Sequence, residues 1–131
     1  MIFIDSNVPM YLVGAAHPNK DRAVAVLTEF ALQGERFITD VGVYQEILHR
    51  YVAIQRPDAI DAAFETLDGI VDDVFTFGMP EVRAARALLN SASRLSARDA
   101  LHAAVMRKAG ASRILSFDAG FDACPGIERI E

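Results

Sequence analysis

Five acidic side chains of this chain fall where the polypeptide leaves an expected strand or enters the helix beside one. They are, in chain order, Asp5, Glu46, Asp99, Asp118 and Asp122. If these positions converge, each pair of carboxylates about 5 Å apart repels by roughly 3 kcal/mol at an effective dielectric constant of 20. Several ionised carboxylates therefore need a cation among them. A ligand set made only of oxygen atoms selects a hard divalent ion, Mg²⁺ or Mn²⁺.

The sequence lacks the residue patterns of other common catalytic and metal-binding sites. The three histidines and the single cysteine lack the spacing of zinc ligands. No Ser/His/Asp or Cys/His arrangement demands a covalent mechanism, and no Gly-rich G-x-x-x-x-G-K loop is present to cradle a phosphate. Phosphate contacts must then come from scattered arginines. Arg50, Arg94 and Arg98 are the nearest in sequence to the acidic residues, although the ordinary alternative for each is a solvated surface side chain.

Each acidic residue also has an ordinary structural role. Asp5 can simply begin a loop after an apolar run, and Glu46 can be a solvated residue paired with Arg50 four positions on. Asp99 is the last residue of an S-x-x-D capping pattern that Ser96 begins. Capping and metal binding are compatible, because one carboxylate oxygen can accept from the backbone while the other faces outward. The metal hypothesis therefore rests on the whole set.

The last part of the chain carries two further alternatives. Asp118 can form a turn beside Gly120. His102 shares a helix face with Asp99 one turn earlier, and we expect it to be packed in the core or solvated.

Apolar runs and helical spacing alternate along the chain. Strands are expected at residues 1–4, 36–39, 73–77, 113–117 and 127–130, and helices from residue 7, at 19–32 or 21–32, and at 41–54, 57–69, 80–89 and 96–110. Helical spacing within 19–32 and 41–54 gives each helix an apolar face. These faces are Val24, Leu27, Ala31 and Leu32 on the first helix, and Tyr44, Ile47, Leu48, Tyr51 and Val52 on the second.

Strands separated by helices predict a parallel sheet covered on both faces. We therefore expect one domain over residues 1–131, with an α/β fold in three α/β/α layers around a mostly parallel sheet of four or five strands. In such sheets, ligands bind beyond the carboxyl ends of the strands, where the strand order reverses. The acidic residues occupy those ends in the predicted arrangement.

Composition limits the classes of protein to consider. The formal net charge of −5 argues mildly against a simple nucleic-acid-binding module, but carboxylates gathered around a metal leave the rest of the surface nearly balanced. One cysteine cannot form an internal disulfide, which favours the cytoplasm, and neither a signal peptide nor a membrane-spanning stretch is expected. Apolar residues make up 52% of the chain and the mean hydropathy is +0.20, so a partner is expected to cover part of the surface.

Four segments together resemble the PIN-domain ribonucleases, and within them the VapC-type toxins of bacterial toxin–antitoxin pairs. They are IFIDSNV, TDVGVYQEIL, SARDALHAAVMRKAG and ILSFDAGFD, and they span nearly the whole chain in the order and spacing of that family. The resemblance implies a PIN-like fold with metal ligands at Asp5, Glu46, Asp99 and Asp118. It also implies a less regularly occupied acidic position at Asp122 and a hydroxyl beside the site at Ser116.

The resemblance also implies activity and partners. The expected activity is Mg²⁺- or Mn²⁺-dependent endoribonuclease action on RNA, within a homodimer inhibited by a cognate antitoxin. Helices 19–32 and 41–54 are the candidates for lining an antitoxin groove. Two alternatives stay open, a catalytically inactive PIN-like module that binds RNA or protein and a non-toxin phosphohydrolase of α/β fold.

Two related α/β classes fit the residues poorly. A phosphatase of the haloacid dehalogenase type needs a second Asp two positions after the first, and that position holds Asn7. A receiver-like signalling domain needs an adjacent acidic pair and a late lysine. Ser6 follows Asp5 here, and no lysine follows Lys108.

Overall fold

The computed structural model describes residues 1–91 and 94–131. Its five strands form one sheet in which every neighbouring pair is parallel, with the order β3-β2-β1-β4-β5. The strands are β1 (Ile2–Ile4), β2 (Phe37–Asp40), β3 (Asp73–Phe75), β4 (Arg113–Leu115) and β5 (Glu128–Ile130). The expected α/β fold with a parallel sheet is confirmed.

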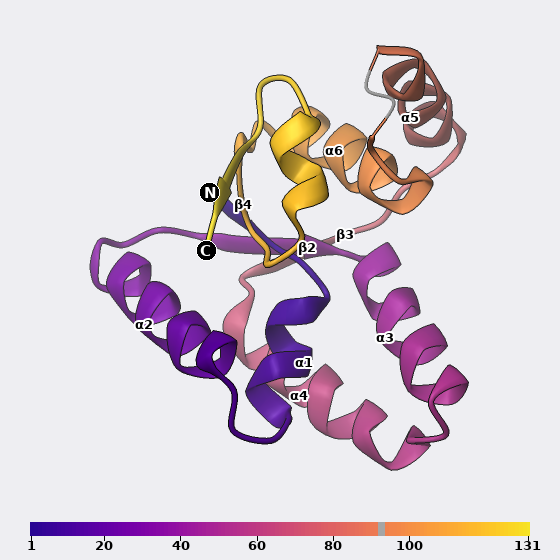
Figure 1. Ribbon diagram of the computed structural model, residues 1–131. Helices are drawn as coiled ribbons and strands as arrows, with labels where there is room; N and C mark the ends of the chain where they lie inside the picture. Colours follow the sequence, from indigo (N-terminus) through magenta and orange to yellow (C-terminus); the bar gives the residue numbers. More distant parts are fainter. Residues whose placement is uncertain (92–93) are drawn as a thin grey trace.

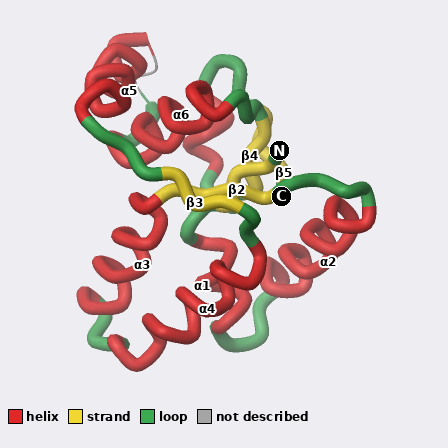
Figure 2. The backbone as a smooth tube through the Cα atoms, turned by 180° about the vertical axis from the view of Figure 1, so that it is seen from behind, coloured by secondary structure: helices red, strands yellow, loops and turns green. Residues whose placement is uncertain are grey.

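Helices cover both faces of this sheet. They are α1 (Asn7–Val13), α2 (Pro18–Leu32), α3 (Val41–Ala53), α4 (Ile60–Ile70), α5 (Met79–Ser91) and α6 (Ala97–Ala109), with short 3₁₀ turns η1 (Pro57–Ala59) and η2 (Ala119–Ala123). Figures 1 and 2 show α1 to α4 on one side of the sheet and α5 and α6 on the other. The three layers expected from the sequence are therefore present.

Local signals explain where the helices begin and end. The Ser96 hydroxyl accepts from the Asp99 backbone N–H at 3.1 Å, so the predicted capping pattern opens α6, and Gly110 closes that helix with a left-handed φ of 80°. The Asp40 carboxylate caps α3 by accepting from the Val43 backbone N–H at 3.0 Å. Most predicted strand and helix ends lie within two residues of their observed positions. The segment predicted to be helical from residue 57 instead opens with the 3₁₀ turn η1, and α4 begins at Ile60.

The central strands form the core. Ile2, Phe3 and Ile4 of β1 have no solvent exposure, which is the pattern of a strand covered on both faces. Burying one such side chain contributes about 1.5–3 kcal/mol to the free energy of unfolding.

Among the described residues, no helix combines the length and the apolar character that a bilayer crossing requires.

The apolar faces expected on α2 and α3 are only partly buried in the core. On α2 the buried residues are Ala23 and Val26, whereas Val24 and Leu32 are 50% and 85% exposed. On α3, Ile47 and Tyr51 of the expected apolar face are buried, as is Val43, whereas Leu48 and Val52 are 43% and 62% exposed. Both helices carry apolar residues around much of their circumference, so spacing alone does not fix the arc that meets the sheet.

The strand order reverses between β1 and β4. From β1 the chain builds outward through β2 and β3, whereas β4 and β5 lie on the other side of β1. Ile4 pairs with Leu115 at the last position of both strands. Asp5 and Ser116, the next residues, therefore emerge side by side at the point where ligands bind in open parallel sheets.

Candidate metal centre

A cavity of about 460 Å³ lies beyond the carboxyl ends of β1 and β4. Four of the five acidic residues selected from the sequence line it, and two arginines join them. The lining residues are Asp5, Ser6, Asn7, Met10, Tyr11, Glu46, Arg50, Ser96, Arg98, Asp99 and Asp118. The fold thus brings together carboxylates separated by up to 113 positions in the chain.

Asp5 is the most deeply placed of these carboxylates, with 4% of its surface exposed. Its Oδ1 accepts from the Ser6 backbone N–H at 2.8 Å, and its Oδ2 accepts from the Ser116 hydroxyl at 2.6 Å. Burial raises the pKa of Asp5, and the nearby Glu46 adds to the rise, although the hydrogen bonds and His102 oppose it. A negative charge at this position therefore has a high cost without a cation.

Glu46 comes from the second turn of α3 and is buried, with 9% of its surface exposed. Its Oε1 lies 3.6 Å from Arg98 Nε, and its Oε2 lies 3.2 Å from His102 Nε2. The alternative of a solvated residue paired with Arg50 is therefore wrong. Burial raises the pKa of Glu46, but His102, together with Ser6 and Arg98, lowers it by more, so the net shift is downward.

Asp99 stands in the first turn of α6, where the expected cap is present, and it is 7% exposed. Burial raises the pKa of Asp99 to about 6, with further contributions from Asp5 and Asp118.

Asp118 follows β4 and accepts from the Gly120 backbone N–H at 2.9 Å, which is the turn expected from the sequence. A Cβ on Gly120 would lie 3.4 Å from Asp99 Oδ2 and 3.2 Å from Asp118 Oδ1. Both carboxylates therefore face this glycine.

Asp122 lies apart from the cavity lining. Its two oxygens accept from Arg129 Nε at 2.8 Å and from Arg129 Nη2 at 3.0 Å, and the side chain is 56% exposed. The two-pronged contact with a guanidinium occupies the oxygens that a metal would need.

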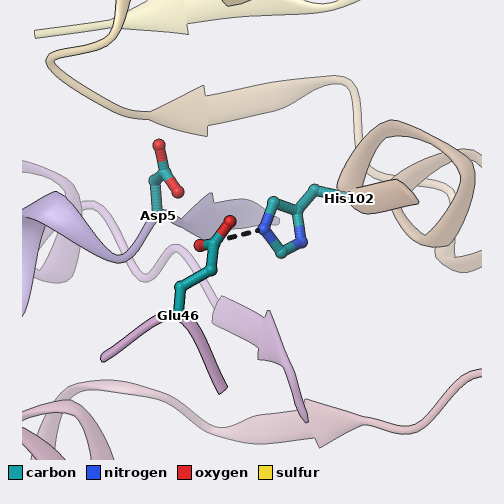
Figure 3. Close-up of side chains that lie close together, drawn as sticks. All are labelled: Asp5, Glu46 and His102. Carbon is teal, nitrogen blue, oxygen red and sulfur yellow. Dashed lines mark ion pairs between the residues drawn. The ribbon is translucent and has the colours of Figure 1, made fainter. Parts of the chain in front are cut away.

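The residues around the cavity fit a divalent ion. Carboxylate oxygens of Asp5 and Glu46 lie within 4.8 Å of each other and of a ring nitrogen of His102, and Figure 3 shows the three side chains together. Buried Glu46 Oε2 has no hydrogen-bond partner, and the raised pKa values of Asp5 and Asp99 reflect negative charge held in a poorly solvated place. Because the carboxylates that face the cavity offer oxygen, the site suits a hard divalent cation.

Asp40 was not singled out in the sequence, and His102 was expected only to be packed or solvated. His102 is packed, at 1% exposed, and its Nδ1 lies 2.7 Å from Oδ2 of the fully buried Asp40. Burial lowers the pKa of His102, but Asp40 and Glu46 outweigh it and hold that pKa well above its ordinary value. Asp40 is the last residue of β2, and Asp5 is the first residue after β1. This similar placement at the carboxyl end of a strand was the signal in the sequence that could have identified Asp40.

Comparison with known proteins agrees with this fold. The profile of the PIN domain family matches residues 2–126. "Ribonuclease VapC13" of Mycobacterium tuberculosis is 52% identical over 130 residues, which cover 99% of both chains. The Mycobacterium tuberculosis VapC20 structure, described as a sarcin–ricin loop cleaving toxin, superposes with a TM-score of 0.76 at 24% identity over 94% of both chains. A toxin–antitoxin complex from Klebsiella pneumoniae gives a TM-score of 0.64 at 13% identity over 98% of this chain and 96% of that one. The last two likenesses concern the fold alone.

Proposed function

Because this chain belongs to the PIN domain family, we propose that its acidic cavity is the catalytic centre of a divalent-metal-dependent endoribonuclease. One observation carries the proposal: four carboxylates from four separate segments of the chain converge on one cavity. Asp5, Glu46, Asp99 and Asp118 would hold Mg²⁺ or Mn²⁺ there. Asp122 is left out of the ligand set because Arg129 engages both of its oxygens.

The chain's own groups have separate tasks in this reaction. When bound, the ion supplies Lewis-acid activation of a water and of the scissile phosphate. Arg50 and Arg98 line the same cavity and are placed to bind phosphate oxygens of the RNA beside the cut. Ser116 and Ser6 orient Asp5 through the hydrogen bonds to its two oxygens. Preorganised ligands of this kind avoid rearrangement during the reaction.

The relatives suggest a cellular role. Full-length relatives carry the name VapC ribonuclease, and toxin–antitoxin complexes share the fold. We therefore propose that this chain is the toxin of a toxin–antitoxin pair, acts in the cytoplasm and is held inactive by a cognate antitoxin. The exposed apolar side chains of α2 and α3 support a docking surface for the antitoxin or for a second copy in a homodimer, and they include Val24, Leu32, Leu48 and Val52.

A panel of alanine variants tests the catalytic proposal. RNA cleavage with added Mn²⁺ should be lost when Asp5, Glu46, Asp99 or Asp118 is replaced. Asp122→Ala is the matched control, because it removes a carboxylate that lies outside the cavity, and it should keep most of the activity. Cleavage that survives in the first four variants would instead favour a binding module with a contaminating nuclease.

Expression in a bacterial host tests the toxin role separately. Wild type should arrest growth, Asp5→Ala should not, and co-expression of the neighbouring antitoxin gene should restore growth. A nuclease that cleaves RNA in vitro without arresting growth would retain the enzymatic proposal and remove the toxin.

A further inference from the structure

His102 occupies a fixed position between two carboxylates. Its Nδ1 lies 2.7 Å from Asp40 Oδ2, and its Nε2 lies 3.2 Å from Glu46 Oε2. Figure 3 shows the ring directed at the Glu46 carboxylate, with Asp5 close by. The imidazole therefore stands as a potential cation between two anions, one of which lines the cavity.

Asp40 fixes the orientation of that ring. Its Oδ1 accepts from the Val43 backbone N–H at the start of α3, while its Oδ2 contacts His102. Because the cap holds the carboxylate in place, Nδ1 has a fixed partner and Nε2 must point toward Glu46. The same short segment thus positions both Asp40 and, six residues later, Glu46.

The surroundings leave the ring little room to turn. The Phe3 ring lies 5.3 Å from the His102 ring, between centroids. A Cβ on Gly42 would lie 3.2 Å from His102 Cε1, 3.1 Å from Asp40 Oδ1 and 3.2 Å from Phe77 Cε1. These separations are tight for a real side chain, so glycine at this position allows the first turn of α3 to approach the ring.

Asp40 and His102 themselves lie behind the cavity. Neither is among its lining residues, and both are almost fully buried. The contact between His102 Nε2 and Glu46 Oε2 is close in distance but lacks hydrogen-bond geometry, and each atom is buried with no other hydrogen-bond partner. Glu46 Oε2 therefore lies beside the imidazole without a hydrogen bond that would occupy it.

We propose that Asp40 and His102 form a buried positioning pair that aims the Glu46 carboxylate into the cavity for metal binding. The proposal rests on the proposed function, since it concerns the same acidic cavity. Residues behind a ligand set commonly change metal affinity or activity by about 10- to 100-fold when they are replaced. His102 acts through Glu46 in this account and is not itself a ligand.

The test measures the Kd for Mn²⁺ by titration calorimetry on the purified, metal-stripped full chain. Asp40→Asn is the primary variant, because asparagine keeps the helix cap and the shape but removes the charge that faces His102. Its Kd for Mn²⁺ should rise by about tenfold. His102→Asn, which cannot reach Glu46, should show a similar rise. His102→Gln, whose longer amide reaches toward the place of Nε2, should recover part of the affinity.

A matched control separates positioning from general damage. Glu81→Gln changes another buried carboxylate, which contacts Lys108 Nζ at 2.5 Å between α5 and α6, away from the cavity. It should bind Mn²⁺ with the wild-type Kd even if its thermal midpoint falls. A change of Kd in Glu81→Gln equal to that in Asp40→Asn would overturn the positioning role.

Two results distinguish this proposal from the proposed function. If wild type binds Mn²⁺ and both Asp40→Asn and His102→Asn bind it equally well, the positioning pair is overturned and the metal centre stands. If wild type itself binds no Mn²⁺, the metal centre falls and the pair falls with it.

Measurement on wild type alone keeps the proposal testable if the variants fold poorly. Nitrogen-15 NMR of the His102 ring should show the Nε2 proton retained when the protein is saturated with Mg²⁺. Loss of that proton on saturation would leave Nε2 free to act as a ligand atom and would contradict the proposal.

Discussion

Ser116 donates a hydrogen bond of 2.6 Å from its hydroxyl to Asp5 Oδ2, although 111 positions separate the two residues. The same hydroxyl oxygen accepts from the Asp118 backbone N–H at 3.0 Å. One side chain therefore ties the end of β1 to the loop after β4, where the strand order reverses. The position of two candidate ligands depends on this contact.

Replacing Ser116 with alanine should weaken both the fold and the activity. Loss of the hydroxyl leaves a buried Asp5 oxygen without its closest donor, which costs about 1–3 kcal/mol of unfolding free energy. Urea denaturation of the metal-free protein measures this loss, with exposed Ser112→Ala as the control. RNA cleavage by Ser116→Ala should also fall. Wild-type stability and activity in Ser116→Ala would show that the contact does not organise the site.

Asp5→Asn should leave the metal-free protein at least as stable as wild type at neutral pH. Burial and the neighbouring Glu46 raise the pKa of Asp5, so the charged carboxylate is destabilising in the folded state. A neutral amide of the same shape removes that charge, which offsets the one accepted hydrogen bond that its nitrogen cannot make. Urea denaturation in the presence of a chelator provides the comparison. A clear loss of stability in Asp5→Asn would argue against a crowded cluster of charges.

Affinity for Mn²⁺ should increase as the pH rises from 5.5 to 7.5. The pKa of Asp99 is raised from 3.8 to about 6, so between these two values the folded state binds more protons than the unfolded state. The stability that this carboxyl contributes to the metal-free protein is then greatest at low pH and is lost as the pH rises through about 6.

An ion must displace the proton on Asp99, so binding at pH 5.5 should be about fourfold weaker than at pH 7.5. Titration calorimetry at the two pH values measures the ratio. The Asp99→Asn variant is the control, because it has no such proton to lose. Equal affinity of wild type at both pH values would contradict a role for this carboxyl.

The elements of the fold could be predicted because their signals are local. Ser96 and Gly110 mark the two ends of α6 in the sequence, and the apolar run of β1 stops at Asp5. The parallel sheet then follows from strands separated by helices. Its edge collects Asp5, Glu46, Asp99 and Asp118, which is why the cavity could be anticipated.

The parts that could not be predicted depend on how the elements are rotated against one another. Asp40 and His102 are 62 positions apart, and their contact requires the buried face of α6 to meet the end of β2. The exposed positions of Leu32 on α2 and Val52 on α3 have the same origin. Apolar spacing sets the helix but leaves its rotation to packing.

The protein should form a homodimer in solution. Leu48 and Val52 lie on the exposed side of α3, and burying them against a second copy removes apolar surface from water. Light scattering at micromolar concentration should give twice the monomer mass, and Val52→Glu should shift the mass toward the monomer. Val82→Glu, on α5 across the sheet, is the control. A wild-type monomer at this concentration would remove the homodimer.

Removal and return of the metal during RNA cleavage is the most direct test of the central claim, that the acidic cavity is a metal-dependent ribonuclease centre. Wild type treated with a strong chelator should lose cleavage and regain it when Mg²⁺ or Mn²⁺ is added in excess. Asp5→Asn, assayed in parallel, should stay inactive under both conditions. Cleavage by wild type that continues unchanged in the chelator, or equal cleavage by Asp5→Asn after the metal is returned, would contradict the account.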